Sequence, residues 1–169
     1  TLNLLPMTEP YSGPPLFKPQ LMGSGGETTT PAVLSVTGNN AIVDWVYIEI
    51  RDGINCNTVL ATKNALIQRD GDIVSAADGV SPLTFTGLAP GNYYIAVKHR
   101  NHLGVMCAAP IPLTAGGPVF VDFTTIPLWT NPSITSNAAA NFTGSIQVMW
   151  CGDPNYNKNI KYNGIFNDK

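Results

Sequence analysis

The segment from Ser81 to Gly104, SPLTFTGLAPGNYYIAVKHRNHLG, alternates apolar and polar side chains on both sides of a Pro-Gly break. Before the break, Leu83 and Phe85 alternate with threonines. After the break, one face carries Tyr93, Ile95, Val97 and His99. A period of two, rich in β-branched and aromatic residues and bounded by turn formers, predicts β-strands. We therefore expect a strand, a tight turn and a second, Tyr-rich strand here.

The rest of the chain shows the same kind of pattern in shorter pieces. The segment AIVDWVYIEIR (41–51) is apolar on both faces, which predicts a strand that is covered on both sides. Asp70-Gly71 predicts a hairpin turn. The remaining expected strands cover 31–36, 58–63, 65–69, 73–74, 105–113, 118–124 and 145–151. No segment predicts a helix, so the fold class we expect is all-β.

Turn signals recur about every eight to twelve residues, which is typical of a β-sandwich of the immunoglobulin-like or prealbumin-like kind. Residues 1–31 hold six prolines and a Gly-rich run, which predicts an extended arm or long loop. The arm is rich in apolar residues, so we expect it to lie against its own domain or a neighbouring subunit. The expected organisation is an arm over 1–31, a sandwich over 32–151 and an Asn/Asp-rich segment over 152–169.

Composition restricts the compartment and the partners. Charged residues make up only 12% of the chain, the net charge is −2, and no Lys/Arg cluster is present, which argues against binding nucleic acid through its phosphates. No run approaches the roughly 18 apolar residues of a membrane span. Low charge with 16 glycines and 14 prolines suits an extracellular β-protein. The first residue is Thr1 rather than Met, as in a processed product.

Three cysteines, Cys56, Cys107 and Cys151, are far apart and lack the spacing of a metal-binding motif. One disulfide with one remaining thiol is the natural expectation outside the cell, and the spacing does not decide which pair forms it. Three buried cysteines acting as small hydrophobic residues are the alternative.

Several stretches together resemble a module near the C-terminus of large secreted multi-domain surface proteins of Bacteroidetes. They are AIVDWVYIEIRD (41–52), ALIQRDGDIV (65–74), DGVSPLTFTGLAPGNYYIAVKHRNHLGVM (78–106) and MWCGDPNYNKNIKYNGIFNDK (149–169), with LLPMTEPYSG upstream. The resemblance covers nearly the whole chain. It implies an extracellular or cell-surface stalk, adhesion or assembly domain, carried by a protein exported through a dedicated outer-membrane system. It implies no catalytic motif.

Such modules usually have a further apolar strand before the position of Thr1 and another after an Asn-Asp-Arg sequence that appears here as Asn167-Asp168-Lys169. A sandwich without these strands has open edges, which accept strands from other chains. Either the ends of the sequence are truncated, or a neighbouring subunit completes the sandwich. In the second case we expect a homo-oligomer or filament, with subunits joined by exchange of a strand or of the N-terminal arm.

The C-terminal sequence DPNYNKNI (153–160) places oxygen-bearing side chains at alternate positions, as in the first half of a calcium loop. The predicted Ca²⁺ ligands are Asp153, Asn155, Asn157, the carbonyl of Asn159, and Asp168 as a closing carboxylate. The twelfth position of the loop is Gly164 rather than Glu, and Lys158 replaces the usual glycine. The alternative is an Asn-rich turn that its own side chains stabilise.

Two further groups are candidate binding residues. The polar run KHRNH (98–102) brings His99, Arg100 and His102 to a strand end, as a binding rim or as a two-histidine metal signal without a third ligand. Its alternative is a solvated turn. Exposed aromatic residues in Asn-rich surroundings suit a glycan platform, and the candidates are Trp129, Tyr156 and Tyr162.

No motif of a serine hydrolase, zinc protease, P-loop enzyme or dinucleotide-binding enzyme is present in the sequence. The leading hypothesis is therefore a non-catalytic extracellular module that self-assembles into a surface fibre or stalk. The alternative is an adhesin or carbohydrate-binding module. A glycosidase with carboxylates distant in sequence is the third hypothesis.

Overall fold

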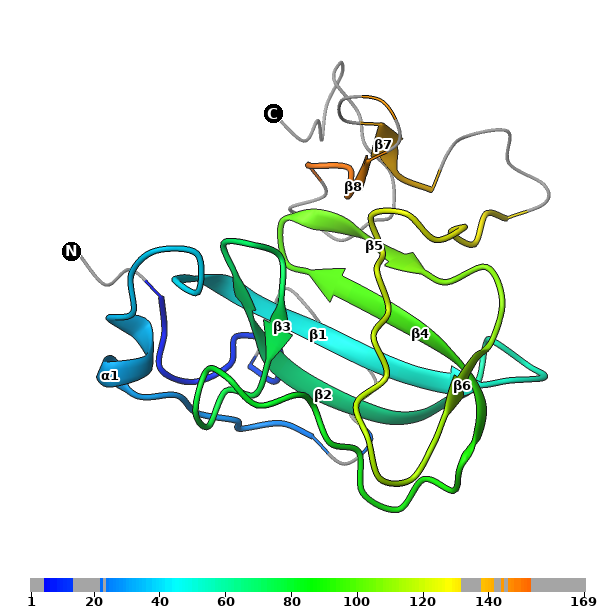
Figure 1. The fold of residues 1–169 in the computed structure, drawn as a ribbon, viewed down its shortest axis with the longest axis horizontal. Coiled ribbons are helices and arrows are strands. Elements are labelled where there is room, and N and C mark those ends of the chain that lie inside the picture. Colours follow the sequence, from blue (N-terminus) through cyan, green and yellow to red (C-terminus); the bar gives the residue numbers. More distant parts are fainter. Residues whose placement is uncertain are drawn as a thin grey trace. The chain divides into compact units, whose positions relative to one another are not determined.

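The computed structural model describes residues 5–13, 22, 24–131, 138–141, 144 and 146–152 of the chain. Almost all of the regular structure in these residues is β, which confirms the all-β class (Figure 1). The elements are α1 (Pro31–Leu34), β1 (Ile42–Asp52), β2 (Val59–Gln68), β3 (Ile73–Val74), β4 (Gly91–His99), β5 (His102–Met106), β6 (Ile111–Leu113), β7 (Ala140–Asn141) and β8 (Gln147–Val148). No helix in the described part of the chain is long and apolar enough to span a bilayer.

The chain forms two compact units that are interleaved in sequence. Unit 1 contains residues 1–49 and 59–88, and unit 2 contains residues 50–58 and 89–169. The strand β1 therefore begins in unit 1 and ends in unit 2.

In unit 1, the strands are hydrogen-bonded in the order β3-β2-β1. The strands β2 and β3 form an antiparallel hairpin in which Leu66 pairs with Val74, and Gly71 makes the turn with a φ of 100°. This confirms the hairpin predicted at Asp70-Gly71. The two short strands expected over 58–63 and 65–69 are one continuous strand, β2, because nothing between them breaks the pairing.

The core of unit 1 is built around Trp45 in the middle of β1. Residues 45–50 are all buried, as expected for a strand that is covered on both faces. Tyr11, Leu66 and Val74 pack in the same cluster, together with Val33, Tyr47 and Ala76.

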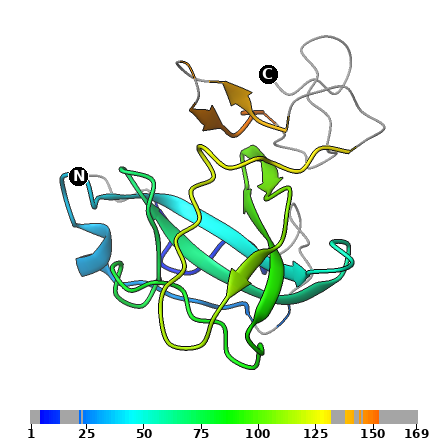
Figure 2. The same ribbon diagram turned by 45° about the vertical axis from the view of Figure 1, so that its right-hand side comes forward.

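Within unit 1, the described parts of the proline-rich N-terminal segment pack against β1 (Figure 2). The Tyr11 hydroxyl donates to the Trp45 carbonyl at 2.7 Å, and the Trp45 indole Nε1–H donates to the Pro6 carbonyl at 2.8 Å. The main chain of this segment also pairs with itself, since Thr8 and Thr28 form an antiparallel bridge. Residues 5–13 and 24–30 are thus held within unit 1.

Helix α1 replaces the strand that the sequence predicts over 31–36. The Thr30 hydroxyl accepts a hydrogen bond from the Val33 amide, and Pro31 occupies the first turn, where its missing N–H costs nothing. Val33 is the buried residue of this single turn. The strand prediction was wrong because it relied on the alternation of apolar residues. In the structure, the capping hydroxyl of Thr30 and the proline at 31 decide the local conformation instead.

In unit 2, β4 pairs antiparallel with both β5 and β6, and β7 pairs with β8. The long Tyr-rich strand predicted after Pro90-Gly91 is confirmed as β4. The strand expected over 105–113 is divided between β5 and β6, with Pro110 between them. The segment expected as a strand over 145–151 contains only the two residues of β8 and a single bridge at Cys151.

Two expected strands are not strands in the structure. Residues 81–86 have no ladder partner, although Leu83 and Phe85 are half-buried and their threonine neighbours are exposed. Residues 118–124 are also irregular, and the Phe120 side chain is 93% exposed. At 83–86, the alternation of apolar and polar residues therefore predicts which side chains face the protein. It does not show that the main chain is hydrogen-bonded to another strand.

The three cysteines are free thiols in the structure. Cys107 is buried, Cys56 is half-buried and Cys151 is exposed. The disulfide expectation therefore finds no support in the structure. The alternative was that all three cysteines are buried and act as small hydrophobic residues. Only Cys107 is buried in this way.

Candidate functional site

The two histidines of the chain meet at the turn between β4 and β5. His99 ends β4, His102 begins β5, and the two are register partners. Their Nδ1 atoms are 2.8 Å apart, and their rings meet edge to face at a centroid distance of 4.7 Å. The Asn101 amide donates to His99 Nδ1 at 3.1 Å, so this nitrogen accepts and His102 Nδ1–H is the donor in the pair. Both rings are half-buried.

A third segment lines the outer edge of β5 beside the histidines. The Leu103 amide donates to the Trp150 carbonyl at 2.9 Å, and the Gly152 amide donates to the Asn101 carbonyl at 3.1 Å. These two bonds flank His102 and Cys151, which face each other as an antiparallel pair. The order across the ladder is therefore His99, His102 and Cys151 on three adjacent segments.

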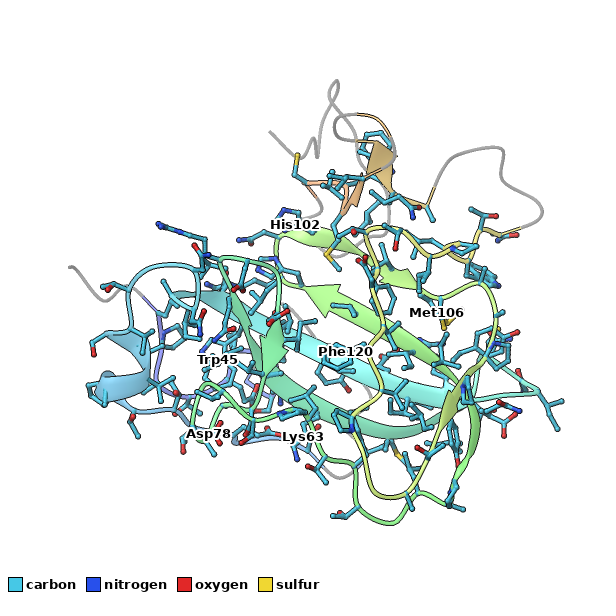
Figure 3. The ribbon with its side chains drawn as sticks, in the orientation of Figure 1. Trp45, Lys63, Asp78, His102, Met106 and Phe120 are labelled. Carbon is cyan, nitrogen blue, oxygen red and sulfur yellow. The ribbon has the colours of Figure 1, made fainter. Side chains whose placement is uncertain are left out.

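The other end of the same edge of β5 is bordered by Trp129. Its amide donates to the Met106 carbonyl at 2.8 Å, and Leu128 bridges Cys107. Figure 3 labels His102 and Met106, which mark the two ends of β5. Trp129 and Trp150 thus pair with β5 at Met106 and Leu103, about 10 Å apart along the strand. Each tryptophan side chain is 39% exposed.

An apolar row lies on the segment that contains β8. Ile146, Val148 and Trp150 are 43%, 38% and 39% exposed, while Gln147 and Met149 between them are half-buried. Gln147 fixes the segment from the other side, since its amide donates to the Thr124 carbonyl at 2.9 Å and its side chain donates to the Ile126 carbonyl at 2.8 Å. The sequence predicted a strand here but did not identify its apolar side as exposed.

A shallow hollow in unit 2 of about 360 Å³ is lined by Asp52, Gly53, Ile54, Gly91, Asn92 and Tyr93. Its polar groups already serve the turn. The Asp52 carboxylate accepts from the amides of Asn55 at 2.7 Å and Ile54 at 2.9 Å, and these bonds lower its pKa below its ordinary value. The Tyr93 hydroxyl donates to the Ala89 carbonyl at 2.6 Å. The hollow is therefore better explained as a stabilised turn than as a ligand site.

The structure brings together some of the predicted site residues. His99 and His102 are in contact, whereas Trp129 borders the other end of β5, at Met106. Arg100 follows His99 in the turn and is half-buried. The other predicted residues lie outside the described part of the chain, namely the calcium-loop residues Asp153, Asn155, Asn157, Asn159 and Asp168, and the aromatic residues Tyr156 and Tyr162.

Within the described ranges, no three side chains of His, Cys, Asp or Glu are already arranged to hold a metal ion. The chain matches no family model, no curated protein and no solved structure. The resemblance to Bacteroidetes surface modules therefore stays a prediction.

Proposed function

We propose that this chain is a non-catalytic structural module that associates with copies of itself to form an extracellular fibre or stalk on a bacterial surface. The observation that carries the proposal is the apolar row of Ile146, Val148 and Trp150. These side chains recur at every second position on one extended segment, as the contact face of a strand does. Contiguous exposed apolar surface of this kind marks interaction sites.

The low charge of the chain supports self-association. Identical chains with a net charge of −2 repel each other weakly, and only 12% of the residues are charged. Apolar side chains that a neighbouring copy covers contribute about 25 cal/mol for each Å² removed from water. Three large side chains that are roughly 40% exposed therefore supply part of an interface, and Phe120 in the same unit adds further apolar surface.

The test compares the native sequence with a triple variant, Ile146→Ser, Val148→Thr and Trp150→Ser. We expect the native chain to form larger species with rising concentration in sedimentation velocity, and regular filaments in negative-stain images. The triple variant should stay monomeric. Because the hydrogen bonds of Trp150 and Leu103 join main-chain atoms, the substitutions leave them in place.

The matched control is the double variant Ile54→Ser and Val80→Thr, which removes side chains that are 98% and 72% exposed elsewhere. It should assemble as the native chain does. Assembly that is unchanged in the triple variant, or a native chain that is monomeric at all concentrations, would show that the proposal is wrong.

The finer features of this proposal extend the observed β-fold. They are an immunoglobulin-like or prealbumin-like sandwich, joining of subunits by strand or arm exchange, and a Ca²⁺-stabilised C-terminal loop. In an arm exchange, Tyr11 of one subunit would occupy the position beside Trp45 of the next, by the same contacts that it makes within unit 1. Removal of Ca²⁺ with a chelator should then weaken the filaments.

The second candidate is an adhesin or carbohydrate-binding module, which the two half-exposed tryptophans beside β5 favour. Aromatic rings present an apolar face to a sugar ring, and the polar turn at His99 provides hydrogen-bonding groups nearby. A glycan array with the native chain and with Trp129→Ala tests this function. Binding that the substitution abolishes, in a chain that does not assemble, would replace the structural proposal.

A further inference from the structure

We propose that His99, His102 and Cys151 form a binding site for a zinc-like divalent cation. The site is independent of the proposed self-assembly and of the predicted calcium loop. It joins the turn between β4 and β5 to the segment that runs along the outer edge of β5. Its ligand set is two imidazoles and one thiolate.

The two imidazoles are already close to the spacing that a shared metal requires. Their Nδ1 atoms are 2.8 Å apart. Tetrahedral zinc with Zn–N bonds of about 2.0–2.1 Å separates two nitrogen ligands by about 3.3 Å. Insertion of a cation therefore requires the two rings to move apart by only about half an ångström. The N–H···N hydrogen bond of the pair and the bond from the Asn101 amide to His99 Nδ1 are exchanged for two metal–nitrogen bonds. His102 passes to the tautomer that carries its proton on Nε2, and the Cys151 thiol proton leaves to solvent.

The register places Cys151 beside this pair. His102 and Cys151 are directly opposite each other between two flanking main-chain hydrogen bonds, Leu103 to Trp150 and Gly152 to Asn101. Opposite residues in such a pair project to the same face with Cβ atoms about 4.5–5.5 Å apart. His102 is likewise the register partner of His99. The three side chains therefore start from neighbouring positions on one face, and rotation of the Cys151 side chain brings its Sγ to the metal.

Of the three thiols, Cys151 is the one suited to bind an exogenous metal. It is exposed, whereas Cys107 is buried, accepts the Ile95 amide at 3.2 Å and has its pKa raised by burial. Cys56 lies in a different turn, where its carbonyl accepts from Arg51 at 2.7 Å.

The chemistry of the donor set selects the metal. Imidazole and thiolate suit Zn²⁺ and neighbouring late transition metals, whereas Ca²⁺ takes oxygen ligands. Three protein ligands also leave a fourth tetrahedral position for water. We therefore expect Zn²⁺ to bind and an excess of Ca²⁺ not to displace it.

The experiment titrates the metal-free, reduced 169-residue chain with Zn²⁺ by calorimetry and with Co²⁺ by absorption spectroscopy. We expect one metal ion per chain and a thiolate-to-cobalt charge-transfer band in the near ultraviolet. Cys151→Ser should abolish the band and weaken Zn²⁺ binding, and His99→Gln and His102→Gln should each weaken it, by at least about ten-fold. Thermal melts of the metal-free variants separate loss of a ligand from loss of the fold.

The matched control is Cys56→Ser, which should leave both the band and the affinity unchanged. A native chain that binds no metal overturns the proposal, as does a charge-transfer band that survives in Cys151→Ser. Displacement of Zn²⁺ by Ca²⁺ would also overturn it, because it would locate the bound metal at oxygen ligands.

Discussion

The phenol of Tyr11 donates a 2.7 Å hydrogen bond to the main-chain carbonyl of Trp45, 34 residues further along the chain. Both side chains are buried, with exposed fractions of 1% and 0%. The Tyr11 ring also lies against Tyr47, with centroids 5.8 Å apart and planes inclined by 48°. One side chain therefore attaches the proline-rich segment to the centre of β1.

Replacement of Tyr11 by Phe should lower the free energy of unfolding by about 1–2 kcal/mol, because the buried Trp45 carbonyl loses this donor while the ring remains. Urea unfolding measures this. The control is Tyr93→Phe, whose hydroxyl bonds to the Ala89 carbonyl at an exposed position, and which should cost less than about 0.5 kcal/mol. Equal costs for the two substitutions would contradict the structural role assigned to Tyr11.

Glu9 should make the stability of the chain depend on pH in the acid range. Burial raises the pKa of its carboxyl, but hydrogen bonds from the Ser12 hydroxyl and from the amides of Gly26, Tyr11 and Ser12 outweigh burial and leave the pKa below its ordinary value of 4.5. A group whose pKa is lowered by folding stabilises the protein above the ordinary value. This contribution is lost as the pH falls through the lowered pKa.

We therefore expect the free energy of unfolding to fall as the pH decreases below 4.5. In Glu9→Gln this slope should be shallower. At neutral pH the variant should be about 2 kcal/mol less stable, because the bonds to a carboxylate are lost. Denaturant titrations between neutral and acid pH give both quantities. The same slope in both proteins would argue against Glu9 as the titrating group.

Gly79 should not tolerate a side chain, for two separable reasons. Its φ is +70°, and a Cβ there would lie 2.6 Å from Cγ1 of Val33 on α1. Gly79→Ala should thus cost about 1–2 kcal/mol for the backbone and a further amount for the clash. Gly87→Ala is the control, because Gly87 has a φ of +83° with nothing within 4 Å of a Cβ.

Thermal or urea unfolding of Gly79→Ala with Val33→Ala separates the two terms. The double variant should be more stable than the sum of the single changes predicts, since the smaller residue at 33 removes the clash. Additive effects would mean that α1 does not lie over Gly79.

Gly53 is a second position where space alone excludes a side chain. A Cβ there would lie 2.1 Å from the main-chain oxygen of Asn92, and its φ is not in the left-handed region. Gly53→Ala should destabilise the chain by about 2 kcal/mol in urea unfolding. Gly117→Ala, which meets nothing within 4 Å, should change stability little. A neutral Gly53→Ala would show that this turn can move away from Asn92.

The elements that could be predicted from sequence are those in which the apolar pattern of a segment matches the way the segment is buried or is paired with a strand close in sequence. In β1 the apolar residues occupy both faces and Trp45 is buried, as a covered strand requires. The hairpin of β2 and β3 follows from Asp70-Gly71, since a turn of this type sets the register of its own flanking strands. The strand β4 follows from the alternation that begins at Tyr93.

The strand predictions were wrong where a segment has the apolar alternation of a strand but no other segment in the described part of the chain forms a ladder of hydrogen bonds along it. Leu83 and Phe85 alternate with exposed residues, but no strand pairs with them. At 118–124, the Asp122 carboxylate accepts from the Thr124 amide at 2.9 Å, so the chain turns where alternation predicted a strand. At α1, the sequence contains the capping residue Thr30, but the strand prediction followed the apolar alternation of the residues after it.

The candidate site was only partly accessible to sequence reasoning. His99 and His102 are three residues apart, so a turn between them was enough to predict that they lie close together. Cys151 is 49 residues from His102, and only the pairing at the edge of β5 reveals that they are opposite each other. The exposure of Ile146, Val148 and Trp150 also depends on distant segments, because the same alternation describes a buried strand face.

The interleaving of the two units has a consequence for how the chain can be divided. The main chain leaves unit 1 after residue 49, returns at residue 59 and leaves again after residue 88. No single cut in the gene therefore separates one unit from the other, and a fragment that ends within 50–58 lacks β2 and β3. Any single truncation or recombination point within the chain therefore divides at least one of its two compact units.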